Sequence, residues 1–167
     1  VEQAGPFDAV IAPVSGGGLL SGTAIATHGL DPSVRVLGGE PAQAADAHAS
    51  LRRGTLVTDM TPDTIADGLR AQLCARTYAI LRAHAVEVLL AGEDGIVAAM
   101  RLVWDRLKLV VEPSGAVALA ALIAGREGVA GLRIGVILSG GNVDLDRLPW
   151  QEPRFRRELP PAAGGIA

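Results

Sequence analysis

Lysine is almost missing from this sequence. Only Lys108 is a lysine among 15 basic residues in a chain of 167. This scarcity limits chemistry that depends on a side-chain amine more than any other feature of the composition does. Cysteine is equally scarce, because Cys74 stands alone and excludes an internal disulfide. A reducing, cytoplasmic location is therefore expected.

Other classes of protein are disfavoured by charge and hydropathy. The net charge of −3 and the pI of about 5.6 argue against nucleic acid as a partner. The longest purely apolar run, Ala116–Ala124, is far shorter than the roughly 20 residues that a membrane span needs. No signal-peptide pattern and no initiator methionine precede Val1, so we expect a piece of a longer soluble protein.

Short apolar runs alternate with longer helical stretches along the chain. The runs are apolar throughout rather than at every second residue, which is typical of parallel strands buried on both faces. The predicted strands are Ala9–Ala12, Val34–Gly38, Val86–Leu90 and Ile134–Leu138. The predicted helices are Leu19–His28, Ala42–Arg53, Gln72–His84, Glu93–Leu109 and Ser114–Ala124.

This order predicts an α/β fold with three layers and a mostly parallel, doubly wound sheet. Ligands bind such sheets at the carboxyl ends of the strands. Residues 1–150 are expected to form one unit and residues 151–167 a flexible tail, which is rich in Pro, Ala, Gly and Arg. The segment Thr55–Arg70 has no obvious element, and long loops of this kind are often functional.

A glycine loop, Ser15–Gly18, joins the first strand to the first helix. Successive glycines let the backbone approach an anion, and the unpaired amides of a helix N-terminus point toward it. The loop is not a P-loop, which needs a lysine, nor a dinucleotide fingerprint, because Ser21 replaces its third glycine. A phosphate cradle is one interpretation; a tight turn without ligand is the other.

Three further motifs follow in order. They are Thr64-Ile-Ala-Asp-Gly68, Glu112-Pro-Ser-Gly-Ala116 and Ser139-Gly-Gly-Asn142, the last of which ends the final strand. Read singly, each is weak, and Ser139–Asn142 could be an ordinary turn. Taken with the glycine loop, the four motifs resemble the C-terminal half of the fold-type II pyridoxal-phosphate enzymes. The closest resemblance is to the serine racemase and serine/threonine dehydratase group, over about residues 7–150.

The resemblance implies a partial large domain of the tryptophan synthase β type, and it assigns roles to particular residues. Backbone amides at the glycine loop would hold the phosphate of pyridoxal 5′-phosphate, and Ser139 would hydrogen bond the pyridine nitrogen. A neutral hydroxyl at that nitrogen makes the ring a weaker electron sink, which suits β-elimination. Gly68 would lie beside the ring, and Glu112 near its far edge. The implied cofactor-binding residues are Gly16, Gly17, Gly18, Leu19, Gly68, Glu112 and Ser139.

A cation site and a nucleotide site are also implied. The run from Glu40 to Asp46 is similar to a racemase-type metal site with ligands Glu40, Ala44 (by its carbonyl) and Asp46. Oxygen ligands suit Mg²⁺, Mn²⁺ or Ca²⁺, although two acids six residues apart are commonplace. Lys108 and Asn142 match positions that contact a nucleotide activator in the family. Cys74 is expected in the core, and the three histidines show no metal spacing.

The family's Schiff-base lysine lies in an N-terminal half that this chain does not contain, so the chain alone is expected to be inactive. The implied parent is a homodimeric lyase or isomerase that converts serine or threonine to a 2-oxo acid and ammonia, with racemisation as a related activity. Two alternatives stay open. One is a β-replacement synthase, and the other is a non-catalytic module that binds a phosphate-bearing ligand.

Overall fold

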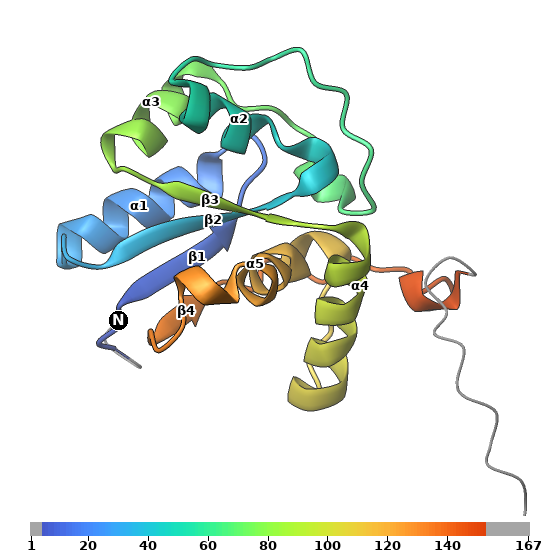
Figure 1. Ribbon diagram of the computed structural model, residues 1–167. Helices are drawn as coiled ribbons and strands as arrows, with labels where there is room; N and C mark the ends of the chain where they lie inside the picture. The colour runs from blue at the N-terminus through green and yellow to red at the C-terminus, as the bar shows by residue number, and fades with distance from the viewer. Residues whose placement is uncertain (1–4, 153–167) are drawn as a thin grey trace, which may run out of the picture.

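The computed structural model describes residues 5–152, and within them the chain forms a four-stranded parallel sheet (Figure 1). The strand order is β3-β2-β1-β4, and all three pairings are parallel. The bounds are β1 Ala9–Pro13, β2 Arg35–Pro41, β3 Glu87–Ala91 and β4 Ile134–Val136. The predicted parallel sheet is confirmed, with strand ends shifted by a few residues.

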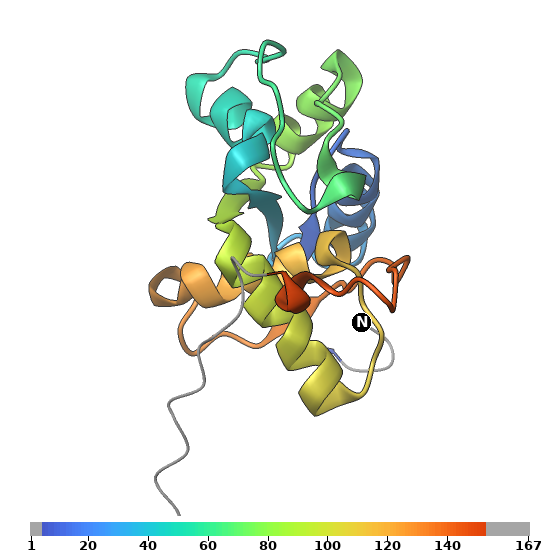
Figure 2. The same ribbon diagram turned by 90° about the vertical axis from the view of Figure 1, so that its right-hand side faces the viewer.

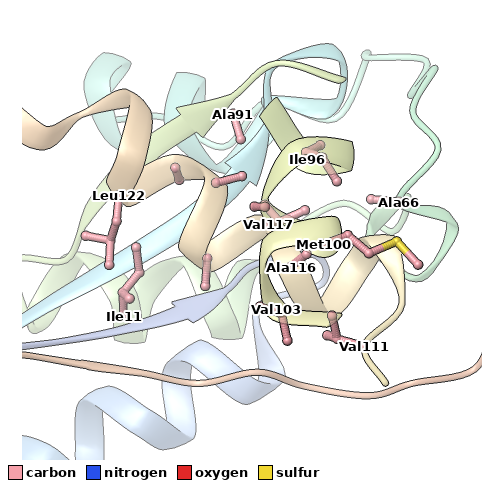
Figure 3. Close-up of a cluster of buried hydrophobic side chains, with 14 of the residues drawn as sticks. Ile11, Ala66, Ala91, Ile96, Met100, Val103, Val111, Ala116, Val117 and Leu122 are labelled. Atoms are coloured by element: carbon pink, nitrogen blue, oxygen red, sulfur yellow. The ribbon is translucent and has the colours of Figure 1, made fainter. Parts of the chain in front are cut away.

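Helices cover both faces of the sheet, as Figures 1 and 2 show. One face carries α1 Gly18–Leu30, α2 Asp46–Arg53 and α3 Ala75–Ala83; the other carries α4 Glu93–Leu102 and α5 Pro113–Ala124. Each layer has its own apolar cluster, and Figure 3 shows the one around α4 and α5. The predicted three-layer α/β architecture is therefore confirmed.

Small residues let α5 lie close against the middle of the sheet. A Cβ placed on Gly39 of β2 would lie 2.7 Å from the Ala118 Cα, so the two backbones nearly touch. Pro113 opens the helix at a position where its missing N–H costs no hydrogen bond. This close packing fixes the N-terminus of α5 at the carboxyl edge of the strands, beside the turn that follows β4.

Two predicted helices differ from the observed ones. The expected helix Ala42–Arg53 is a short 3₁₀ turn, Ala42–Ala44, followed by α2. The backbone breaks at Ala45 because the buried Glu40 carboxylate binds the amides of Ala47 and His48. The expected helix Glu93–Leu109 ends as α4 at Leu102 and continues as a π-helical turn, Val103–Leu107.

The expectation for Cys74 was wrong. This residue is exposed and caps the N-terminus of α3 instead of filling the core. Among the described residues, no helix is both long enough and apolar enough to cross a bilayer. Of the predicted tail, 151–167, residues 153–167 lie outside the described part of the chain.

Candidate functional site

The glycine loop presents free amides at the start of α1. Gly17 has φ +84°, a conformation that favours glycine, and it caps the helix without any side-chain hydrogen bond. Within residues 5–152, no acceptor bonds the amides of Gly16, Gly17, Gly18 or Leu19. A Cβ at Gly18 would meet nothing within 4 Å, so the loop borders open space. These features fit a cradle for an anion.

The loop before α3 lies directly beside this cradle. The Ser15 hydroxyl donates to the Ala71 carbonyl and accepts from the Ala71 amide, both over 3.1 Å. A few residues earlier, within the 3₁₀ turn Asp67–Leu69, the Gly68 amide donates to Ser114 Oγ at the start of α5 over 3.0 Å. The stretch 67–72 therefore bridges the glycine loop and the N-terminus of α5.

Glu93 anchors the same stretch from the start of α4. Its carboxylate accepts from the Thr64 hydroxyl over 2.6 Å and from the Ile65 amide over 2.8 Å. The Arg70 guanidinium then donates to the Thr64 carbonyl through Nε and Nη2. Neither Glu93 nor Ser114 was among the site residues predicted from the sequence. Their position at helix starts is visible in the sequence, but their partners lie 28 to 46 residues away.

The turn after β4 reaches the same edge of the sheet. Ile11 of β1 pairs with Val136, and continuing that register places Ser139 opposite Val14, next to the glycine loop. Ser139 is half-buried, and its hydroxyl has no hydrogen-bond partner within the described part of the chain. The carbonyls of Ser139 and Gly140 lie against Gly115 of α5. The predicted residues Gly16–Leu19, Gly68 and Ser139 are thus brought to one edge.

Glu112, the N-cap residue of α5, lies at this same edge of the sheet. Gly140 has φ +100°, and a Cβ there would strike the Glu112 carboxylate. Burial raises the pKa of Glu112, the charge of Asp67 raises it further, and a hydrogen bond from the Asn142 amide opposes them. The environment thus favours the protonated form of Glu112 more than water does. The site can hold an anion at one end and offers a free hydroxyl and a carboxyl group at the other.

The predicted metal ligands lie at the carboxyl end of β2. Glu40 is buried, and its two oxygens accept from the amides of Ala47 and His48, each over 2.8 Å. Burial raises the pKa of Glu40 to about 8, with Asp46 adding repulsion. Burial also raises the pKa of Asp46, whose Oδ2 accepts from the Leu73 amide. Among residues 5–152, no three His, Cys, Asp or Glu side chains cluster as metal ligands.

The remaining candidates have structural partners or stay predictions. His28 and His84 join α1 to the end of α3 by a hydrogen bond of 2.8 Å between their Nδ1 atoms, as a structural role predicts. Lys108 has φ +56° at the end of the π-helical turn and is exposed. Its contact with a nucleotide, like that of Asn142, stays a prediction.

Comparisons with known proteins converge on one family. A family model described as "Pyridoxal-phosphate dependent enzyme" matches residues 1–140. A β-hydroxyaspartate dehydratase of Paracoccus denitrificans is 47% identical over 150 residues, which are 90% of this chain and 48% of that protein. A serine racemase of Dictyostelium discoideum is 42% identical over 152 residues, 89% of this chain and 47% of that protein.

A solved structure agrees with these relatives. The structure of maize serine racemase superposes with a TM-score of 0.83 and 42% identity, covering 90% of this chain and 47% of its own. The chain spans about half the length of the curated relatives that it matches.

Proposed function

The chain belongs to the family of pyridoxal-phosphate dependent enzymes, and from this premise we propose that it forms the coenzyme-binding half of an amino-acid lyase or racemase. The observation that carries the proposal is the row of free amides at Gly16–Leu19, which lies at the carboxyl edge of the sheet and has open space beside Gly18. A phosphoryl group supplies the acceptors that these donors lack.

Each of these residues at the carboxyl edge of the sheet would contact a particular part of the coenzyme. The amides of Gly16–Leu19 bind the phosphate, and the Ser139 hydroxyl bonds the pyridine nitrogen. Gly68 would lie beside the ring, and its missing side chain lets Ser114 approach the backbone, since a Cβ there would lie 3.0 Å from Ser114 Oγ. Glu112 lies at the ring's edge, where its raised pKa favours a carboxyl group that can donate a hydrogen bond. When bound, the coenzyme supplies the electron sink for cleavage at the amino acid's Cα.

The proposed reaction is β-elimination from a 3-hydroxy amino acid. The Cα proton and the β-hydroxyl leave, and hydrolysis of the resulting enamine releases a 2-oxo acid and ammonia. Serine and threonine are candidate substrates by the resemblance described above. The relative named β-hydroxyaspartate dehydratase adds hydroxyaspartate as a third. By the resemblance described above, the catalytic lysine and the groups that bind the substrate's carboxylate would belong to a preceding, N-terminal half of the parent.

We propose that this preceding half docks beside β4. β4 is an edge strand of the sheet described here, and an unpaired edge is a template for a further strand. An apolar groove of about 350 Å³ lies next to it, between β1, β4 and α1. Its lining includes Phe7, Val10, Leu30, Val136 and Ile137. Relatives about twice as long have the additional chain to cover it.

A divalent cation at Glu40, Ala44 and Asp46 is a second part of the proposal. Two buried carboxylates lie close enough here for the charge of Asp46 to raise the pKa of Glu40, and no donor of the described residues bonds the Ala44 carbonyl. Such oxygen ligands, with water completing the shell, suit Mg²⁺, Mn²⁺ or Ca²⁺. The cation would offset the repulsion between the two acids.

Assembly and location complete the proposal. Exposed apolar side chains gather around the π-helical turn and the segment after it, namely Leu102, Leu107, Leu109 and Val110. An apolar patch of this kind supports an interface between two copies of the parent. We propose a homodimer in the cytoplasm. The resemblance supports the dimer, and the single cysteine supports a reducing location.

The experiment uses the full-length parent protein. Purified with pyridoxal 5′-phosphate, it is assayed for 2-oxo acid and ammonia from L-serine, L-threonine and β-hydroxyaspartate, and for D-serine from L-serine. Formation of 2-oxo acid supports the proposal and ranks the substrates. Coenzyme binding without any product would favour the non-catalytic module. Product that forms only when a second nucleophile is added would favour the β-replacement synthase.

A further inference from the structure

Asp46 reaches across from α2 to the loop that precedes α3. Its Oδ2 accepts a hydrogen bond from the Leu73 amide over 2.9 Å. Both residues are buried, with 5% of Asp46 and 3% of Leu73 exposed. A buried amide needs an acceptor, and within the described chain Asp46 is the acceptor for Leu73. This bond fixes where the Leu73 backbone lies, two residues before α3 begins.

Leu73 in turn forms a wall beside the glycine loop. A Cβ built on Gly17 would lie 2.6 Å from Leu73 Cδ2 and 2.8 Å from the Thr77 Cβ. The side chains of Leu73 and Thr77 therefore leave little room around the backbone turn at Gly17. The φ of Gly17 is +84°, a backbone conformation that is available mainly to glycine. A small shift of Leu73 would change the space around this turn and so its conformation.

We propose that Asp46 is a positioning residue for the phosphate site, acting through Leu73 on Gly17. By fixing Leu73, Asp46 keeps the glycine turn in the conformation that points the amides of residues 16–19 toward one acceptor. The inference rests on the proposed function, since it assumes that those amides hold the coenzyme's phosphate. It adds a role for Asp46 that needs a hydrogen-bond acceptor but no negative charge and no metal.

The distinction between acceptor and charge gives the test. Asn at position 46 keeps an oxygen within reach of the Leu73 amide, whereas Ala removes it. The full-length protein, freed of divalent cations with EDTA, is titrated with pyridoxal 5′-phosphate and, separately, with pyridoxal, which lacks the phosphate. Binding is followed by the visible absorbance of the bound coenzyme. Asp31→Ala is the matched control, because the Asp31 carboxylate hydrogen bonds its near neighbour Ser33 on the surface, away from the glycine loop.

We expect Asp46→Ala to raise the Kd for pyridoxal 5′-phosphate about tenfold, a typical effect of losing one buried hydrogen bond. Asp46→Asn should stay within about threefold of wild type, and the Kd for pyridoxal should change in neither variant. Leu73→Ala keeps the Asp46 bond but removes the wall, and it should weaken pyridoxal 5′-phosphate alone. This variant decides the question if Asp46→Ala does not fold.

Three results would overturn the inference. One is wild-type affinity in Asp46→Ala, or in Leu73→Ala where Asp46→Ala does not fold. Another is equal weakening by Asn and Ala, which would assign the effect to charge. The third is equal loss of pyridoxal and pyridoxal 5′-phosphate, which would place the effect away from the phosphate. If the wild-type protein binds no pyridoxal 5′-phosphate at all, the proposed function fails and this inference fails with it.

Discussion

The Gly68 amide donates a hydrogen bond to Ser114 Oγ over 3.0 Å, and this contact joins two segments that lie 46 residues apart in the sequence. The same amide also donates to Asp67 Oδ1 over 2.9 Å. Ser114 is buried at the start of α5, whereas Gly68 is exposed in the loop. The bond to Ser114 therefore ties the exposed 3₁₀ turn Asp67–Leu69 to a helix packed against the centre of the sheet.

Ser114→Ala should loosen this tie without disturbing the packing of α5. We expect a loss of about 0.5 kcal/mol in the free energy of unfolding, the lower end of the usual net value of one hydrogen bond, because the Gly68 amide keeps its bond to Asp67. Urea denaturation of the full-length protein measures it, and Ser33→Ala, which removes an exposed hydroxyl, serves as the control. Because Gly68 borders the proposed ring site, coenzyme affinity should also fall. Unchanged affinity would show that Gly68 does not help to hold the ring.

Gly140→Ala should be more harmful than Gly131→Ala. Both glycines have positive φ, +100° and +80°, so both substitutions cost the strain of that backbone, about 1–2 kcal/mol. Only at Gly140 does the new Cβ also strike the Glu112 carboxylate, since nothing lies within 4 Å at Gly131. Thermal unfolding and coenzyme titration compare the two variants. Equal effects on coenzyme affinity would mean that the contact between Glu112 and Gly140 is unimportant to the site.

The Cys74 thiol should react at lower pH than an ordinary cysteine. A hydrogen bond with the Thr77 side chain, followed by backbone hydrogen bonds at the start of α3, lowers the pKa of Cys74 to about 7. The thiolate fraction, and with it the rate of alkylation by iodoacetamide, should therefore reach half its maximum near pH 7. Thr77→Val should move that midpoint upward, whereas Thr55→Val in an exposed loop should not. An unshifted midpoint in Thr77→Val would contradict the assigned cause.

Adding Mn²⁺ to the metal-free, full-length protein should raise its thermal midpoint. At 100 times the dissociation constant, binding to the folded state adds about 2.7 kcal/mol. Glu40→Gln should remove most of this gain, because it replaces a carboxylate of the proposed site. Glu87→Gln on the neighbouring strand should keep it, since Glu87 is exposed and pairs with Arg35. An equal rise in all three proteins would contradict the cation site.

The fold followed from the sequence where local patterns decide the structure. Unbroken apolar runs predicted the strands of a parallel sheet, and the helix predicted over Ser114–Ala124 is α5. The predicted helix Ala42–Arg53 was interrupted because Glu40, a strand residue, binds the amides of Ala47 and His48. That contact reverses the local helical preference, and no periodicity reveals it.

The residues of the candidate site also divide into those that the sequence predicted and those that it did not. Glycine-rich turns can be recognised in the sequence, so the loops that contain Gly17 and Gly140 could be predicted as candidate sites. The contacts of Glu93 and Ser114 could not be foreseen, because their partners lie in a loop far away in the chain. Cys74 was placed in the core by its small apolar character, but capping of α3 holds it at the surface.

Residue-resolved NMR of the isotope-labelled, full-length protein tests the central claim most directly. Pyridoxal 5′-phosphate should move the amide resonances of Gly16, Gly17, Gly18 and Leu19 strongly and saturably, and pyridoxal should move them far less. If the resonances of those four amides do not shift while the coenzyme binds, its phosphate is held elsewhere and the proposed phosphate site is wrong.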